Sequence, residues 1–291
     1  MLYQWQQEKS NYLFCTFSLI WISYNTLIRF DTSNKDIQIW VFYDALCGDS
    51  HFYFKNSFRN FYNSINQLNP KISLNIIPGA LEKFDGSLTN QNNDYNDFIC
   101  EHGENECFAN AVHSCALFFF EKSISFNFVD SYFDNLRELG LDINQTSEFC
   151  LKKINKDKSF SNLFECASGL SGKLQINKNI QMKENVQGKI NRSPSNVINK
   201  VFNGSKEDEI EADTLGYLCK NYRIDNLFDS DICKAYKENN FGNYHHRKNY
   251  YSKLKKESAE KRLKFQGLIN WFVNWYPIEL NPLWWKKKTV F

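Results

Sequence analysis

Cys47 lies between an expected strand and an expected helix, a position at which a thiol can act as a nucleophile. The segment Ile37 to Tyr43 is almost continuously apolar, β-branched or aromatic, which is typical of a central strand covered on both faces. The turn from Asp44 to Ser50 follows, and apolar residues then recur at helical spacing from Phe54 to Leu68. Unpaired N–H groups at a helix start favour thiolate over thiol and lower the pKa. By itself, this pattern fits a nucleophile or a small buried residue at a strand end equally well.

The neighbours of Cys47 act on its thiol in opposite directions. His51 would stabilise a thiolate when protonated, whereas Asp44 and Asp49 would oppose it. Asp49 or Ser50 has a short polar side chain suited to the N-cap of the following helix. We therefore expect a helix to begin at this turn, with Cys47 at its N-terminal end.

The stretch from Cys100 to Cys115 reads Cys-Glu-His-Gly-Glu-Asn-Glu-Cys-Phe-Ala-Asn-Ala-Val-His-Ser-Cys. It resembles the signature of the gamma-interferon-inducible lysosomal thiol reductase (GILT) family, Cys-Gln-His-Gly-x-x-Glu-Cys-x-x-Asn-x-x-x-x-Cys. Every fixed position matches except Glu101, where the family usually has Gln. The resemblance covers roughly residues 37 to 233. We interpret two signature residues, His102 and Asn110, as structural: a turn and a helix-packing contact.

This resemblance implies that Cys47 is a catalytic nucleophile that acts on protein disulfides. The family motif is generally Cys-x-x-Cys, and its second thiol resolves the mixed disulfide formed with a substrate. Here that position is Ser50, whose hydroxyl forms no disulfide and is barely ionised near neutral pH. A dithiol cycle at Cys47 alone is therefore excluded. The remaining options are a monothiol exchange resolved by an external thiol, a long-lived mixed disulfide, or a relic site on a binding scaffold.

Pro194 is the expected partner of Cys47 across the site. Thioredoxin-like sites place a cis-proline opposite the nucleophile, where it exposes the preceding backbone to a substrate peptide. The body of the chain contains only Pro70, Pro78 and Pro194, and the first two flank the second expected strand. Residues 193–199, Ser-Pro-Ser-Asn-Val-Ile-Asn, also resemble the family's Val-Pro-x-x-Val-x-Asn stretch. The alternative is an ordinary trans turn proline.

The remaining cysteines favour a disulfide-bonded protein in an oxidising compartment. The structural disulfide candidates are Cys100, Cys107, Cys115, Cys150, Cys166, Cys219 and Cys233. A zinc site is disfavoured because the chain has no Cys-x-x-Cys knuckle. Spacing does not give the connectivity, but closeness in expected hairpins favours Cys219 with Cys233 and Cys150 with Cys166. The family often has a further cysteine where this chain has Asp130, so we expect one body cysteine without a partner.

The order of expected elements indicates a thioredoxin-like α/β fold. A second strand is expected over Lys71 to Ile77, a surface loop over Asp85 to Asp97, and helices from Glu106 to about Gly172. Lys173 to Arg192 is predicted to be a loop or a frayed helix. A short strand near Val197 to Phe202 and one helix over Glu207 to Tyr222 complete the fold, in which residues of about 100 to 190 form a helical insertion.

Three parts are expected along the chain: residues 1–30, 31–240 and 241–291. The first contains an apolar run of signal-peptide length, which favours a secretory signal peptide; the alternatives are an uncleaved anchor or an ordinary buried segment. The last holds 11 Lys and Arg against 3 Asp and Glu, so the tail is basic. Its segment 265–288 contains four of the seven Trp, which suits a membrane surface, a partner protein, or packing on the body.

Together these observations predict a thiol-disulfide oxidoreductase of the secretory pathway, lysosomal or extracellular, with disulfide-containing protein clients. Glycosylation sequons at Asn144, Asn191 and Asn203 matter only on that route. An external thiol such as glutathione would resolve the intermediate, and we expect no cofactor, no metal and no nucleic-acid partner. The alternative is a catalytically inactive thioredoxin-like interaction or structural protein that its C-terminal tail anchors to a membrane or complex.

Overall fold

The computed structural model describes residues 37–66, 72–79, 83–84, 95, 97–138, 142–222, 233–234, 251–257, 260–261 and 263. All of them belong to the unit Ile37–Phe291. The expected signal or anchor of residues 1–30, most of the expected loop at 85–97 and the tail segment 265–288 lie outside the described residues.

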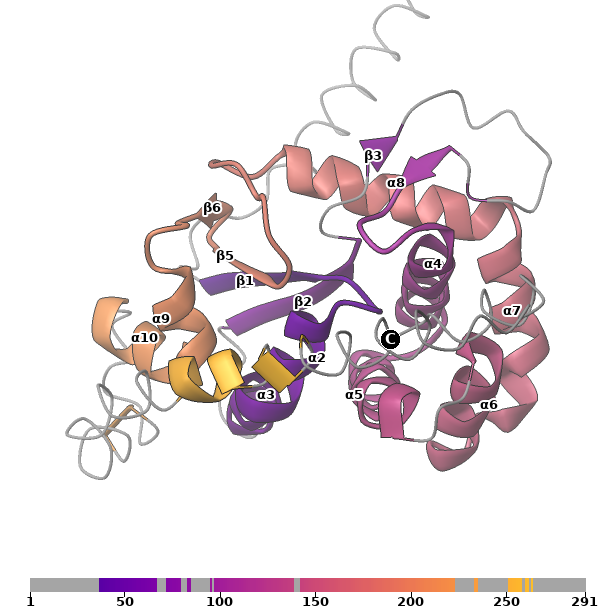
Figure 1. Cartoon of the computed structure of the whole chain (residues 1–291), viewed down its shortest axis with the longest axis horizontal. Helices are drawn as coiled ribbons and strands as arrows, with labels where there is room; N and C mark the ends of the chain where they lie inside the picture. The colour runs from indigo at the N-terminus through magenta and orange to yellow at the C-terminus, as the bar shows by residue number, and fades with distance from the viewer. Residues whose placement is uncertain are drawn as a thin grey trace, which may run out of the picture. The chain divides into compact units, whose positions relative to one another are not determined.

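A four-stranded sheet of order β2-β1-β5-β6 forms the centre of the fold (Figure 1). Strand β1 (Ile37–Tyr43) pairs in parallel with β2 (Ile72–Pro78) and antiparallel with β5 (Ser195–Ile198). The sheet ends at β6 (Val201–Phe202), antiparallel to β5, and β3 (Lys83–Phe84) with β4 (Phe98–Ile99) forms a separate pair. The buried central strand expected from the sequence is confirmed.

Helices connect and cover these strands, and the fold is thioredoxin-like α/β. Helix α2 (Gly48–Tyr53), a π-helical turn η1 (Phe54–Phe58) and α3 (Arg59–Asn66) join β1 to β2. The insertion contains α4 (Glu104–Phe119), α5 (Lys122–Glu138), α6 (Ile143–Lys153), the 3-10 turn η2 (Asp157–Ser159), α7 (Phe160–Ser168) and α8 (Leu170–Glu184). Helices α9 (Glu207–Ala212) and α10 (Thr214–Asn221) follow the sheet.

Two helical predictions need correction. The segment expected to be a loop or a frayed helix contains the regular helix α8, whose pattern is obscured because Lys173 is buried and its Nζ lies 3.1 Å from the Asp97 carboxylate. The single helix expected over Glu207 to Tyr222 is two helices. Asp213 divides them, since its side chain accepts a hydrogen bond from the Gly216 N–H and caps α10.

Three disulfides cross-link the described part of the chain. They join Cys100 to Cys107, Cys115 to Cys166, and Cys219 to Cys233. The last is a pairing that the sequence favoured, whereas the favoured Cys150–Cys166 pairing is wrong. Cys166 of α7 meets α4 instead, and Cys150 of α6 is a free, buried thiol that interacts with Ser131 of α5.

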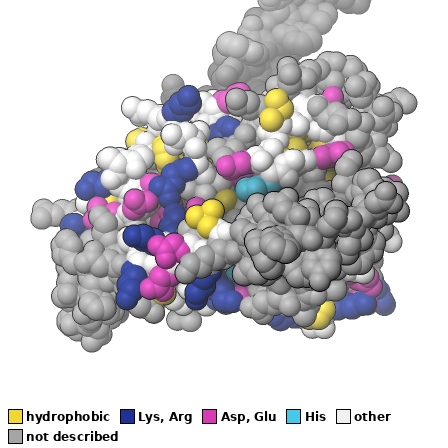
Figure 2. Space-filling view, viewed as in Figure 1, with side chains coloured by type: hydrophobic (Ala, Val, Ile, Leu, Met, Phe, Trp, Pro, Cys, Tyr) yellow, Lys and Arg dark blue, Asp and Glu magenta, His cyan; other side chains and the backbone are white. Residues whose placement is uncertain are grey.

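An aromatic core fixes the end of β1, from which the site begins. Tyr43 is fully buried and packs against Phe54 and Phe133, with ring centroids 5.0 and 5.7 Å away. Its hydroxyl hydrogen-bonds Nδ1 of the buried His113 on α4 at 3.1 Å. On the face seen in Figure 2, basic and acidic side chains of the described residues are interspersed.

Candidate active site

Cys47 sits between β1 and α2 and lines a cavity of about 330 Å³. Its side chain is 7% exposed. Its backbone N–H donates to the Asp44 carbonyl, and its carbonyl accepts from the N–H of His51 within α2. The other residues that line the cavity are Gly48, Asp49, Glu101, His102, Asn191, Arg192 and Ser193.

Asn110 holds the turn that carries Cys47. Its Oδ1 accepts from the Ala45 N–H at 2.8 Å, and its Nδ2 donates to the Asp44 carboxylate at 3.2 Å. The side chain is fully buried, so these bonds form away from competing water. Asn110 therefore fixes the approach to the site from α4, a more specific role than the helix-packing contact expected from the sequence.

The Ser193–Pro194 peptide bond is cis and lies beside the Cys47 sulfur. The Cys47 thiol donates to the Ser193 carbonyl oxygen at 3.6 Å, although these residues are far apart in the sequence. The cis isomer and the proximity expected of Pro194 are thus confirmed. Its role in aligning a client remains a prediction.

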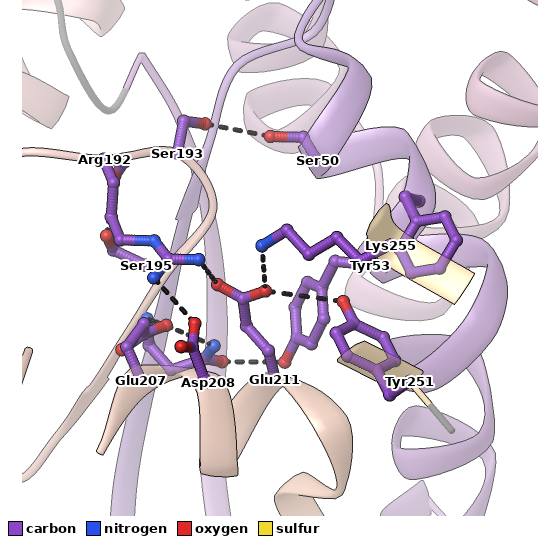
Figure 3. A network of polar contacts seen from close by, with 12 residues as sticks. Ser50, Tyr53, Arg192, Ser193, Ser195, Glu207, Asp208, Glu211, Tyr251 and Lys255 are labelled. Atoms are coloured by element: carbon purple, nitrogen blue, oxygen red, sulfur yellow. Dashed lines mark hydrogen bonds and ion pairs between the residues drawn. The ribbon is translucent and has the colours of Figure 1, made fainter. Parts of the chain in front are cut away.

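Ser50 links α2 to the cis-proline loop. It is fully buried, its Oγ lies 2.9 Å from the Ser193 Oγ, and it accepts a hydrogen bond from the Asp44 N–H at 3.2 Å (Figure 3). The prediction that Asp49 or Ser50 caps α2 is wrong: the N-cap residue is Cys47, without a side-chain capping bond. The hydroxyl is occupied by the turn and the loop instead.

The environment of Cys47 raises the pKa of its thiol, contrary to the sequence-based expectation. Burial has the largest effect, because it disfavours the charged thiolate. The N–H groups of Ser50 and Asp49 and the Ser50 hydroxyl lower the pKa, whereas the Asp44 carboxylate raises it. His51 is not among the cavity residues; its ring packs against Phe133 with centroids 6.1 Å apart. Cys47 is therefore mainly a protonated thiol at neutral pH.

His102 lines the same cavity as Cys47. The sequence predicted only a turn at His102 and did not place this residue at the site. Gly103 has a φ of +82°, a conformation that favours glycine, so the chain turns sharply between His102 and α4. The imidazole Nδ1 lies 2.7 Å from the buried Glu106 carboxylate, which also accepts from the His102 N–H. The His-x-x-x-Glu spacing at a helix start was the sequence signal for this pair.

Arg192 connects the cavity to the described part of the tail (Figure 3). Its guanidinium pairs with Asp208 at 2.9 Å and with the fully buried Glu211 at 2.5 Å. The other oxygen of Glu211 lies 2.8 Å from the Lys255 ammonium and accepts from the Tyr251 hydroxyl. No single-sequence signal identified this network, because its members come from the loop, α9 and the tail.

Glu207 is a buried carboxyl beside this network. Its Oε1 accepts from the backbone and side-chain N–H groups of Asn196, and its buried Oε2 has no hydrogen-bond partner. Burial raises the pKa of Glu207 to about 8, the Asn196 bonds oppose this, and the nearby Glu211 charge adds to it. The native state thus binds a proton here that the unfolded chain releases near pH 4.5.

We therefore expect the free energy of unfolding to fall as the pH rises toward 8, and Glu207→Gln to flatten this dependence. Between pH 6.5 and pH 8 the wild type should lose about 2 kcal/mol, because the contribution of a raised pKa is lost as the pH rises through its native value. Glu211 acts in the same direction through its raised pKa. The pKa of buried His113 is lowered to about 3, so His113 has its effect below this interval.

Urea unfolding at several pH values measures this slope. Asp208→Asn is the matched control, since it removes a mostly exposed carboxylate from the same helix. Its curve should run parallel to the wild type. If the Glu207→Gln curve also runs parallel, the raised pKa of Glu207 is wrong.

Metal and membrane features add no further site. Within the ranges that the structure describes, no group of three or more His, Cys, Asp or Glu side chains is arranged to hold a metal ion. None of the helices among those residues combines the length and the apolar character needed to cross a bilayer.

Comparison with known proteins shows a similarity to one family over part of the chain. Residues 38–154 match the family model "Gamma interferon inducible lysosomal thiol reductase (GILT)". The chain is 23% identical over 199 residues to a gamma-interferon-inducible lysosomal thiol reductase-like protein of Anopheles gambiae, covering 64% of this chain and 76% of that protein. It is 22% identical over 208 residues to GILT-like protein 1 of Drosophila melanogaster, covering 67% and 78%. Residues 38–154 of the chain are thus similar to the GILT family.

Proposed function

We propose that the protein exchanges disulfides of protein clients through Cys47 as a single nucleophile. The observation that carries this proposal is the Cys47 sulfur on a cavity wall, 3.6 Å from the carbonyl that precedes the cis-proline. A client chain entering the cavity would lie along the Ser193–Pro194 backbone and bring its disulfide to the sulfur. The match of residues 38–154 to the GILT family model supports the reaction class.

The exchange balances with an external monothiol as the reductant. The Cys47 thiolate attacks one client sulfur, forms a mixed disulfide and releases the other client sulfur as a thiolate. A glutathione-type thiolate then attacks the mixed disulfide, regenerates Cys47 and leaves the client–glutathione disulfide. A second glutathione reduces that species and yields oxidised glutathione. Two electrons thus pass from two external thiols to one client disulfide.

The proposed location is the secretory pathway, in a lysosomal or extracellular compartment. The family's description names a lysosomal reductase. Three disulfides within the described residues also suit an oxidising route, since reducing compartments keep thiols free.

A non-catalytic interaction protein is the second candidate, and two observations favour it. Cys47 is 7% exposed, and burial raises the pKa of its thiol. Low exposure limits the access of a client to the sulfur. The raised pKa lowers the fraction of thiolate, which is the nucleophile. In this case the scaffold binds partners and the sulfur has no turnover.

Changing the external thiol tests the monothiol cycle. Insulin reduction by the wild type should rise with glutathione concentration, because glutathione must resolve each mixed disulfide. Ser50→Cys restores a thiol at the resolving position and should reduce this dependence when a dithiol reductant regenerates the site. Ser50→Ala is the matched control: it loses the bonds to Ser193 and Asp44 without adding a thiol. Equal glutathione dependence in the wild type and Ser50→Cys would contradict the monothiol cycle.

A further inference from the structure

Glu106 holds the His102 imidazole in one orientation at the cavity. Its carboxylate is fully buried and bonds both the His102 backbone N–H, at 2.9 Å, and the ring Nδ1, at 2.7 Å. A carboxylate accepts only, so Nδ1 carries the proton of this bond. Nε2 is then the ring nitrogen left for exchange with the cavity, and the side chain is 44% exposed. The Cys100–Cys107 disulfide closes the loop that carries His102.

The proposed exchange needs a proton carrier at this cavity. Cys47 is buried as a neutral thiol that donates to the Ser193 carbonyl, so its proton must leave before the sulfur attacks. The client sulfur that departs gains a negative charge and needs a proton in return. Among the described residues that line the cavity, His102 is the group whose ordinary pKa is suited to both transfers near neutral pH.

We propose that His102 is the acid–base residue of this site and that Glu106 is its positioning residue. His102 takes the Cys47 proton as the sulfur attacks and delivers it to the client sulfur that leaves. The proton count closes within one exchange, since the imidazole ends as it began and the client thiol carries the proton of Cys47. This inference rests on the proposed function, because it assigns a role within that reaction.

The charges around His102 determine its pH dependence. The hydrogen bond to Glu106 raises its pKa most, burial lowers it, and the charges of Glu106, Glu101 and Asp44 raise it. Asp49 and Arg192 line the same cavity and add one charge of each sign. His102 therefore titrates above the ordinary histidine value. The rate at which Cys47 reacts should therefore rise with pH as His102 loses its proton. This rise, the His102 limb of the pH–rate profile, should lie below the pH at which the thiol itself titrates.

The test is the rate at which iodoacetamide alkylates Cys47 between about pH 5 and about pH 9. In the wild type the rate should show the His102 limb. His102→Gln should abolish that limb and lower the rate near neutrality by about 100-fold, the lower end of the general acid–base range. Glu106→Gln should move the limb to lower pH, because the main cause of the raised pKa is gone.

Glu101→Gln is the matched control, since it removes a carboxylate from the same cavity that is not the hydrogen-bond partner of the ring. It should keep the limb with a smaller shift than Glu106→Gln. A wild-type limb in His102→Gln overturns the acid–base role, and equal shifts in the two glutamate variants overturn the positioning role. Thermal unfolding of each variant verifies the fold, and Glu106→Gln still tests the proposal if His102→Gln does not fold.

Alkylation requires no client, so the two proposals fail separately. If the wild type alkylates with the His102 limb but reduces no insulin, the proposed function fails and the pairing of His102 with Cys47 stands. If insulin is reduced and His102→Gln keeps the wild-type pH profile of both reactions, the acid–base role fails and the proposed function stands.

Discussion

Replacing Cys47 by alanine is expected to reduce glutathione-dependent insulin reduction to the rate of glutathione alone. The side chain supplies the sulfur that forms the mixed disulfide, and the chain has Ser50 at the position where a second thiol would lie. Without a nucleophile, binding beside the cis-proline cannot break the client bond. Turbidity of the released insulin chains measures the rate.

Cys150→Ala is the control for this loss. Cys150 is the other free cysteine among the described residues, it is fully buried, and burial raises its pKa to about 11. Its removal should leave the reduction rate within about twofold of the wild type, because an inert buried thiol is not a nucleophile. A Cys47→Ala rate equal to the wild-type rate would contradict the role of Cys47, and if both equal the rate of glutathione alone, the non-catalytic interaction protein is the candidate that remains.

Removing the Cys115–Cys166 disulfide should cause the largest loss of stability among the three bridges. It closes a separation of 51 residues between α4 and α7, against 14 for Cys219–Cys233 and 7 for Cys100–Cys107. Chain-entropy reasoning gives about 4 kcal/mol for the first and about 3 kcal/mol for the second. Urea unfolding of the double alanine variants measures both.

Packing adds to the entropic loss at this bridge and also at Cys219–Cys233, whose cysteines are fully buried, so the ranking rests on the difference in loop length. Cys115 is fully buried and Cys166 nearly so, which means that both alanine side chains leave unfilled space between the helices. A smaller loss for the Cys115 and Cys166 double variant than for the Cys219 and Cys233 double variant would contradict this ranking.

The features that were predictable from the sequence are those encoded locally. The run from Ile37 to Tyr43 leaves little choice but a buried strand, and the turn with Cys47 follows from where that strand ends. Pro194 was identified as the candidate cis-proline because the other two prolines of the body flank β2. Its cis bond beside Cys47 agrees with that reasoning. The Cys219–Cys233 bridge is short enough for a hairpin argument.

The features that were not predictable depend on tertiary packing. The helix start at Cys47 suggested a lowered pKa, but the degree of burial that reverses it depends on the loop at Ser193, far away in the sequence. Likewise, Cys166 meets Cys115 because α7 packs on α4, and no spacing rule shows that. His102 looked like a turn residue because its place in the Cys47 cavity is a property of the folded chain.

Trapping the covalent intermediate tests the single-sulfur account most directly. Wild-type protein is mixed with insulin without glutathione, quenched with acid, and digested under non-reducing conditions for mass spectrometry. The account predicts one mixed disulfide, between Cys47 and an insulin cysteine, that persists because Ser50 cannot resolve it and that glutathione releases. An adduct at Cys150, or no adduct while insulin is reduced, would contradict it.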